Sequence, residues 1–145
     1  MAAATLVYVA LPAFYIANAR PRLDRPFEYG APEANWQKVM LAAAEWSNEH
    51  LQLSKTDRIL SFNSGLLSWT SNGTVINIDG LANEDWRRFR ASGGSVAGYC
   101  ARVGARYYID GADPAGLFSR YQVRHVIPFG HPTLPSYYVV EVQCP

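Results

Sequence analysis

Residues 74–83, TVINIDGLAN, decide how this chain folds. Thr74–Asp79 is a short, mainly apolar run rich in β-branched residues, which predicts a buried strand. The Asp-Gly pair at its end, with amides around it, has the chemistry of a turn. Similar apolar runs precede it at Arg58–Phe62 and follow it at Arg106–Asp110. The sequence therefore predicts three short strands.

Helical periodicity separates these strands, and it marks residues 36–53, 83–90 and 96–103. Helix and strand thus alternate, which favours a mostly parallel, three-layer βαβαβ sheet in an α/β domain. We expect Asn35 and Ser95 to cap the first and last of these helices and Gly104 to end the last. The tail differs, since Tyr121–Phe129 and Tyr137–Gln143 predict an antiparallel strand pair at the sheet edge.

Length and charge limit the classes of protein to consider. The chain has 145 residues, enough for one domain with a core. Its net charge is +1, from 13 basic and 12 acidic side chains. General nucleic-acid binding needs a strongly basic face, so no nucleic-acid partner is expected.

The first residues are apolar and uncharged, which raises the question of a membrane. We expect an apolar membrane-anchor helix at 1–18, a Pro-rich linker at 19–34 and a single α/β domain at 35–145. The apolar segment is compatible with an uncleaved single anchor, with the last membrane helix of a longer protein, or with a helix packed on the domain. Membrane lipid is therefore an expected partner, and the arginines at 20–25 favour a cytoplasmic domain.

Polar side chains gather where the predicted strands end. Asp79 and Asp110 lie at the carboxyl ends of parallel strands, the edge at which open α/β sheets bind ligands. Asn77 and Asn83 extend this set, which would suit a sugar, a ribose or a cation. The alternative, which the residue types favour, is that they form turns and helix caps.

Other segments offer weaker candidates. Arg87, Arg88 and Arg90 surround aromatic residues and would suit a phosphate or lipid headgroup, although a solvated helix face explains them more simply. The loop 92–98 follows a helix rather than a strand, so it does not fit a phosphate loop or a nucleophile elbow. We therefore expect no catalytic residue, no metal site and no cofactor.

Two cysteines leave two interpretations open. Cys100 and Cys144 either form a bridge in an oxidising compartment or remain separate thiols, one buried in a helix and the other near the end of the sequence. The second interpretation is favoured, because a disulfide framework usually needs more cysteines.

Several motifs together resemble a known family. They are DRI at 57–59, SGLLSW at 64–69, VINIDGLAN at 75–83, Tyr99 and RYYID at 106–110. In this order they resemble the C-terminal soluble domain of bacterial multi-span membrane glycosyltransferases, similar to the mannosyl- and aminoarabinosyl-transferases that use polyprenyl-phosphate sugars. The resemblance covers residues 55–110.

The resemblance implies a domain type rather than an activity. The catalytic acid of that family lies near its first membrane helices, which are absent here, so the chain is not expected to be an enzyme by itself. The resemblance also implies an extracytoplasmic, periplasmic domain, against the arginine rule, and we follow the resemblance. The expected function is a membrane-tethered domain that binds or positions a glycan, a lipid-linked sugar or a partner protein. The alternative is a single-span accessory subunit of a larger membrane complex, with a multi-span protein as its partner.

Overall fold

The computed structural model describes residues 32–131 and 134–144, and residues 35–145 group into one compact unit. The anchor predicted at 1–18 lies outside the described residues. The first helix among the described residues begins at Pro32, so Asn35 lies inside it and is not its N-cap. The elements, in chain order, are α2 (Pro32–His50), β1 (Arg58–Ser61), α3 (Ser64–Thr70), β2 (Thr74–Asn77), α4 (Glu84–Ala91), α5 (Val96–Val103), β3 (Tyr107–Asp110), η1 (Pro114–Gly116), β4 (Tyr121–His131) and β5 (Leu134–Val142).

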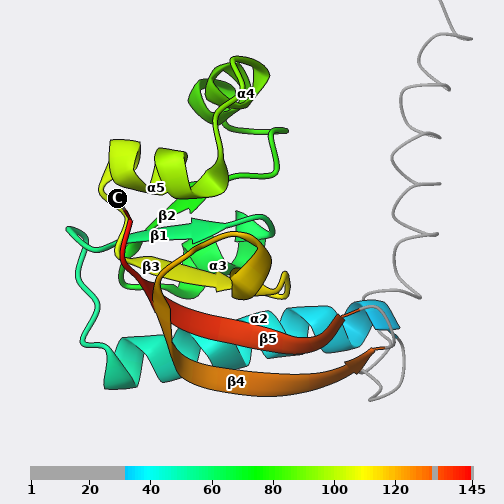
Figure 1. The fold of residues 1–145 in the computed structure, drawn as a ribbon. Coiled ribbons are helices and arrows are strands. Elements are labelled where there is room, and N and C mark those ends of the chain that lie inside the picture. Colours follow the sequence, from blue (N-terminus) through cyan, green and yellow to red (C-terminus); the bar gives the residue numbers. More distant parts are fainter. Residues whose placement is uncertain (1–31, 132–133, 145) are drawn as a thin grey trace, which may run out of the picture. The chain divides into compact units, whose positions relative to one another are not determined.

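The strands form one five-stranded sheet in the order β2-β1-β3-β5-β4 (Figure 1). β1 runs parallel to both of its neighbours, with Ile59 opposite Val75 on β2 and opposite Tyr107 on β3. β5 runs antiparallel to β3, and β4 runs antiparallel to β5. The three strands predicted from the alternation are therefore parallel to one another, and β4 with β5 completes a mixed sheet.

The prediction of a mostly parallel sheet is wrong. The parallel strands are only four residues long each, whereas β4 has 11 residues and β5 has 9. β5 also pairs with β3 along that strand, from Tyr107 opposite Glu141 to Asp110 opposite Tyr138. Most of the strand pairing is consequently antiparallel, because two long strands follow three short ones.

Helices cover both faces of the sheet (Figure 1). On one face α4 and α5 pack on the sheet, and on the other α2 and α3 do so, because alternate residues of each strand point to opposite sides. The larger side chains of the first core are Leu60, Ile78, Trp86, Tyr99, Tyr108, Phe118 and Val140. Those of the second are Met40, Leu53, Ile59, Leu67, Tyr107, Ile109, Tyr137 and Val139.

The membrane-spanning helix of the predicted fold falls at 1–18, outside the described residues, and no described helix could take its role. No helix within 32–131 and 134–144 combines the length and apolarity needed to cross a bilayer.

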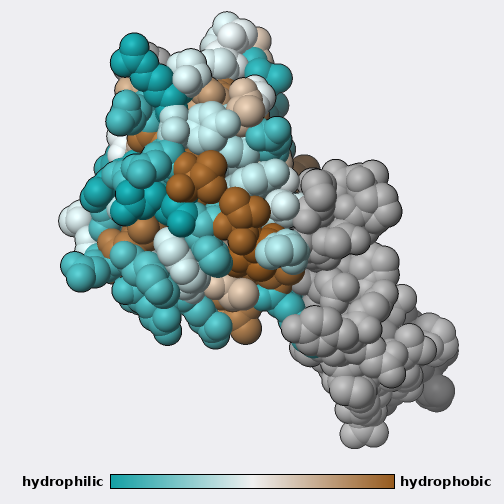
Figure 2. Space-filling model, turned by 60° about the horizontal axis from the view of Figure 1, so that its bottom comes forward, coloured by the Kyte–Doolittle hydropathy of each residue, from teal (hydrophilic) through white to brown (hydrophobic). Residues whose placement is uncertain are grey.

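On the side formed by α2 and β4, apolar surface is visible among hydrophilic surface (Figure 2). Exposed apolar side chains of these two elements include Leu41, Val123 and Val126.

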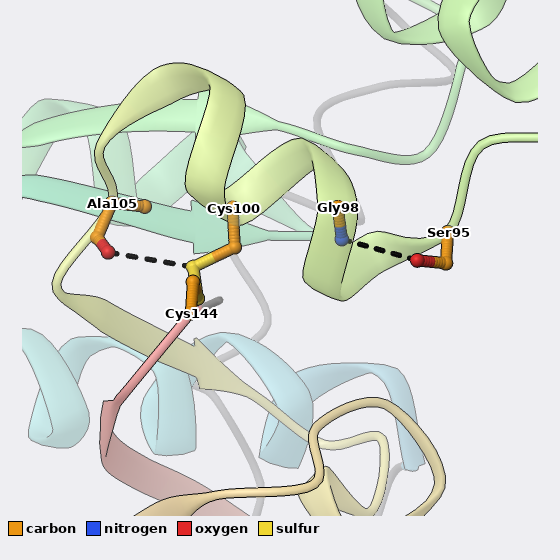
Figure 3. Close-up of a disulfide and its surroundings, with 5 residues drawn as sticks. All are labelled: Ser95, Gly98, Cys100, Ala105 and Cys144. Carbon is orange, nitrogen blue, oxygen red and sulfur yellow. Dashed lines mark hydrogen bonds between the residues drawn. A yellow bond between two sulfur atoms is a disulfide. The ribbon is translucent and has the colours of Figure 1, made fainter.

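The ends of α5 are as the sequence predicts. The Ser95 hydroxyl oxygen accepts a hydrogen bond from the Gly98 N–H at 3.1 Å, which caps the helix (Figure 3). Gly104 has a φ of 62°, the left-handed conformation that commonly ends a helix at glycine. These two residues fix where α5 begins and ends.

Cys100 of α5 forms a disulfide with Cys144, which follows β5 (Figure 3). The two Cα atoms are 5.8 Å apart, within the usual range for a disulfide. The interpretation of two separate thiols is therefore wrong. Cys100 faces the sheet, where it is fully buried, and the chain leaving β5 brings Cys144 to it. This convergence depends on the sheet order, which the spacing of the cysteines does not reveal.

Candidate functional site

Asp110 ends β3, and its buried carboxylate accepts hydrogen bonds from the loop after β1. Asp110 Oδ2 accepts from the N–H groups of Phe62 and Asn63 at 2.8 and 2.9 Å. The same oxygen accepts from the Ser61 hydroxyl at 2.9 Å, and Oδ1 accepts from the Gly111 N–H at 2.7 Å. Such charge-assisted bonds offset the cost of burying a carboxylate. Asp110 therefore holds the β1–α3 loop in place rather than facing a ligand.

Asn77 joins the end of β2 to the start of α3. Its Nδ2 donates to the Ser64 hydroxyl oxygen at 2.7 Å, and its Oδ1 accepts from the Asp79 N–H at 3.1 Å. The Asn77 carbonyl oxygen in turn accepts from Asn83 Nδ2 at 2.8 Å. The loop after β2 and the first turn of α3 are thereby linked through one half-buried side chain.

Asn83 caps α4, as the alternative to ligand binding predicts. Its Oδ1 accepts from the Trp86 N–H at 3.1 Å. Its Nδ2 also donates to the Tyr99 hydroxyl oxygen at 3.1 Å, and that hydroxyl donates to Asp85 at 3.1 Å. Burial raises the pKa of Tyr99, so this phenol stays protonated and can donate at neutral pH.

Asp79 differs from the other three predicted ligand residues because its carboxylate is exposed. Its Oδ1 accepts from the Leu81 N–H at 2.7 Å, which forms a tight turn that Gly80 completes with a φ of 86°. Among the described residues, Oδ2 has no hydrogen-bond partner. One carboxylate oxygen is therefore available to a ligand on a loop that its own hydrogen bonds hold rigid.

The predicted set is thus divided between two places. Asn77, the last residue of β2, is hydrogen-bonded to Asp79 and Asn83 in the loop that follows, residues 78–83, which we call the Asp79 loop. Asp110 lies on β3, on the other side of β1, and is directed into the β1–α3 loop. Of the four residues, Asp79 is the one with an exposed side chain.

Two of the three arginines of α4 form ion pairs with the same glutamate. Glu84 pairs with Arg87 at 2.6 Å and with Arg88 at 2.8 Å. Hydrogen bonds from Arg87, and then from Arg88, lower the pKa of Glu84 to about 2. Arg90 instead donates to the Gly94 carbonyl oxygen at 3.2 Å. The spacing of three and four residues from Glu84 was a visible signal for these pairs.

The sequence-based prediction of binding residues did not include two exposed apolar side chains. Trp69, near the end of α3, is 90% exposed, and Leu81, in the loop after β2, is 91% exposed. Most tryptophans are largely buried, so the exposure of Trp69 is unusual. One feature of the sequence could have indicated an unusual surface here, since residues 59–78 contain no charged side chain. The structure shows that several of these residues are exposed.

The histidines His50 and His125 take part in packing. Their rings stack on Trp46, each with its centroid 4.5 Å from that of the indole. This stack joins the end of α2 to β4. Within the part of the chain that the structure describes, no group of three or more His, Cys, Asp or Glu side chains is placed to hold a metal ion.

A protein-family model described as a domain of unknown function, DUF8728, matches residues 28–142. The chain belongs to the DUF8728 family. Comparisons with curated proteins and with solved structures give no match to this chain.

The DUF8728 match includes every strand of the sheet, the Asp79 loop and α3. The disulfide is not entirely inside it, because Cys144 lies two residues beyond its end. The resemblance to glycosyltransferase appendage domains stays a prediction for this DUF8728 domain, and it enters below only as a proposal.

Proposed function

We propose that this DUF8728 domain is a non-catalytic binding domain that holds a glycan, or the sugar of a lipid-linked sugar, at the Asp79 loop. The observation that carries the proposal is the exposed carboxylate of Asp79, with one oxygen engaged by the Leu81 N–H and the other open. A carboxylate fixed in this way accepts hydrogen bonds from sugar hydroxyls without first losing conformational freedom.

The neighbouring polar groups support binding rather than catalysis. Asn77 and Asn83 are occupied by hydrogen bonds within the loop that contains Asp79, so they position Asp79. Asp110 is occupied in the β1–α3 loop. The resemblance to appendage domains of sugar transferases agrees with this role.

The disulfide supports an extracytoplasmic location, because disulfides persist in oxidising compartments. A lipid-linked sugar or a cell-surface glycan would be available there.

The test is binding of sugars to the purified full chain, measured by calorimetry and thermal unfolding. The probes are neutral oligosaccharides and a polyprenyl-phosphate hexose in detergent. Asp79→Ala should abolish binding while the unfolding transition is kept. Asp79→Asn keeps an oxygen for the Leu81 N–H, so it separates the carboxylate charge from the turn. Unchanged binding by Asp79→Ala would remove the proposal.

A second candidate function rests on Leu81, which is 91% exposed on the same loop. In this function the Leu81 side chain would be buried against an apolar surface of a multi-span membrane protein, which removes its apolar area from water. The chain would then be an accessory subunit of a larger membrane complex. Co-purification with such a protein in mild detergent, lost in Leu81→Asp, would favour this function over sugar binding.

A further inference from the structure

We propose that Trp69 is a stacking platform for an uncharged sugar ring and that the exposed face of α3 is a carbohydrate-binding surface. The α3 surface consists of the exposed residues Asn63, Gly65, Ser68, Trp69 and Asn72. The inference rests on the proposed function and deepens it, since it names the ligand class and a second group of binding residues.

Trp69 is not needed to hold α3 on the sheet. Leu67 is fully buried and anchors the helix, while half-buried Leu66 packs beside it. The indole of Trp69 is 90% exposed instead, so its apolar faces are in contact with water. A ligand that covered those faces would remove their apolar surface from water, which favours binding.

Gly65 leaves room beside the indole. Gly65 precedes Trp69 by four residues and therefore lies on the same side of the helix. A Cβ atom placed on Gly65 would meet nothing within 4 Å. Side chains of helical residues lean towards the preceding turn, so Trp69 is directed towards this open space. A ring lying on the indole would not collide with the helix.

The charge pattern selects a neutral ligand. Residues 59–78 contain no charged side chain, and the exposed members around Trp69 carry amides or hydroxyls. Asn63 occupies the N-cap position, yet its side chain makes no capping hydrogen bond, so its amide faces outward unused. Phosphates and anionic headgroups need cations, and none of the five residues of the α3 surface is one. Lys55 borders the Asn72 end of this surface, where its Nζ donates to the Ser71 carbonyl oxygen at 3.4 Å.

A sugar ring combines the two properties that the α3 surface presents. Its C–H faces are apolar and pack on the negative face of an aromatic ring, while its hydroxyls exchange hydrogen bonds with amides and hydroxyls. The bond from Asn77 to Ser64, and that from Asp79 to Asn77, link the start of α3 to the Asp79 loop. The α3 surface and Asp79 are thus parts of one rigid unit.

The experiment uses the full chain labelled with ¹⁵N on tryptophan, titrated with cellohexaose, mannohexaose and, as a charged probe, hexagalacturonate. The Trp69 indole N–H resonance should shift with a neutral probe more than those of the buried Trp86 and half-buried Trp46. Trp69→Ala should weaken binding about tenfold or more, and Trp69→Phe should keep part of it. Val123→Ala is the matched control, because it shortens an exposed apolar side chain on β4, at the opposite edge of the sheet from β2 and the Asp79 loop.

Each outcome decides between the proposals. Absence of binding by all neutral probes, equal binding by Trp69→Ala, or preference for hexagalacturonate would overturn the inference. Binding that is lost in Trp69→Ala and kept in Asp79→Ala would support the inference and remove the proposed role of Asp79. The reverse pattern would leave Asp79 as the binding residue and overturn the role of Trp69. Because Trp69 is exposed, its replacement should not alter thermal unfolding.

Discussion

Asp110 accepts hydrogen bonds from backbone N–H groups just after β1, where the strand pairing ends. The Phe62 and Asn63 N–H groups have left the strand ladder at this point, and the carboxylate accepts both of them. Unpaired buried N–H groups are rare because each one costs the hydrogen bond it made in water. The order of the β1–α3 loop, and hence of the α3 surface, depends on this one side chain.

Replacing Asp110 should therefore destabilise the protein strongly. Asp110→Ala leaves several N–H and O–H donors unpaired, and we expect the free energy of unfolding to fall by about 3 kcal/mol or more. Urea denaturation measures this change. Asp79→Ala is the control, because it removes one exposed bond and should cost about 1 kcal/mol or less. Equal losses for the two variants would contradict the structural role of Asp110.

Glu84 should give a distinct titration. Hydrogen bonds from Arg87 and Arg88 lower the pKa of Glu84 from its ordinary value of 4.5 to about 2. The ion pairs therefore favour the folded state above pH 4.5, and this contribution disappears as the pH falls from 4.5 towards 2. Carboxyl NMR should show the low midpoint. Arg87→Ala should raise it, and Arg90→Ala should leave it unchanged.

Two residue-scale predictions from sequence are confirmed where the partner is close along the chain, whereas the cap predicted at Asn35 is wrong because the helix begins at Pro32. Ser95 and Asn83 bond to groups three residues away, so their capping roles follow from local rules. The Asn63 N–H that Asp110 accepts is 47 residues away, and only the fold brings the two together. Trp69 was overlooked for a related reason, since exposure depends on which face of α3 packs on the sheet.

At the scale of elements, the disulfide ties α5 to the segment that follows β5. The bridged residues are 44 positions apart, and a cross-link of this span restricts the unfolded chain by about 4 kcal/mol in the chain-entropy treatment. Reduction, or the double variant Cys100→Ser/Cys144→Ser, should lower the free energy of unfolding by up to this amount.

Urea denaturation with and without a phosphine reductant measures the effect of the disulfide. The double variant is the control, since the reductant should leave its transition unchanged. A wild-type transition that does not respond to complete reduction, verified by thiol counting, would show that the bridge contributes nothing to stability.

Strand direction was predictable only in part. Helices between β1, β2 and β3 indicate right-handed crossovers, and these three strands are indeed parallel. The Tyr121–Phe129 and Tyr137–Gln143 runs suggested an antiparallel pair, which β4 and β5 form. Local patterns did not reveal that this pair would dominate the sheet, since that follows from the length of β4 and from the pairing of β5 with β3.

At the scale of the whole molecule, sheet order predicts where the structure opens first. β1, β3 and β5 each have a strand on both sides, whereas β2 and β4 are edge strands. Amide hydrogen exchange should therefore be slowest in β3 and β5 and faster along the outer side of β4. Mass spectrometry with short peptides resolves these strands. Stronger protection in β4 than in β3 would contradict the strand order, unless a partner covers that edge.

The position of β5 between β3 and β4 also determines what an incomplete chain would expose. A released chain that ended before residue 134 would leave one edge of β3 bare and give β4 no strand to pair with. Such a fragment would present unpaired backbone groups on β3 and β4, the kind of surface that chaperones bind and that otherwise aggregates.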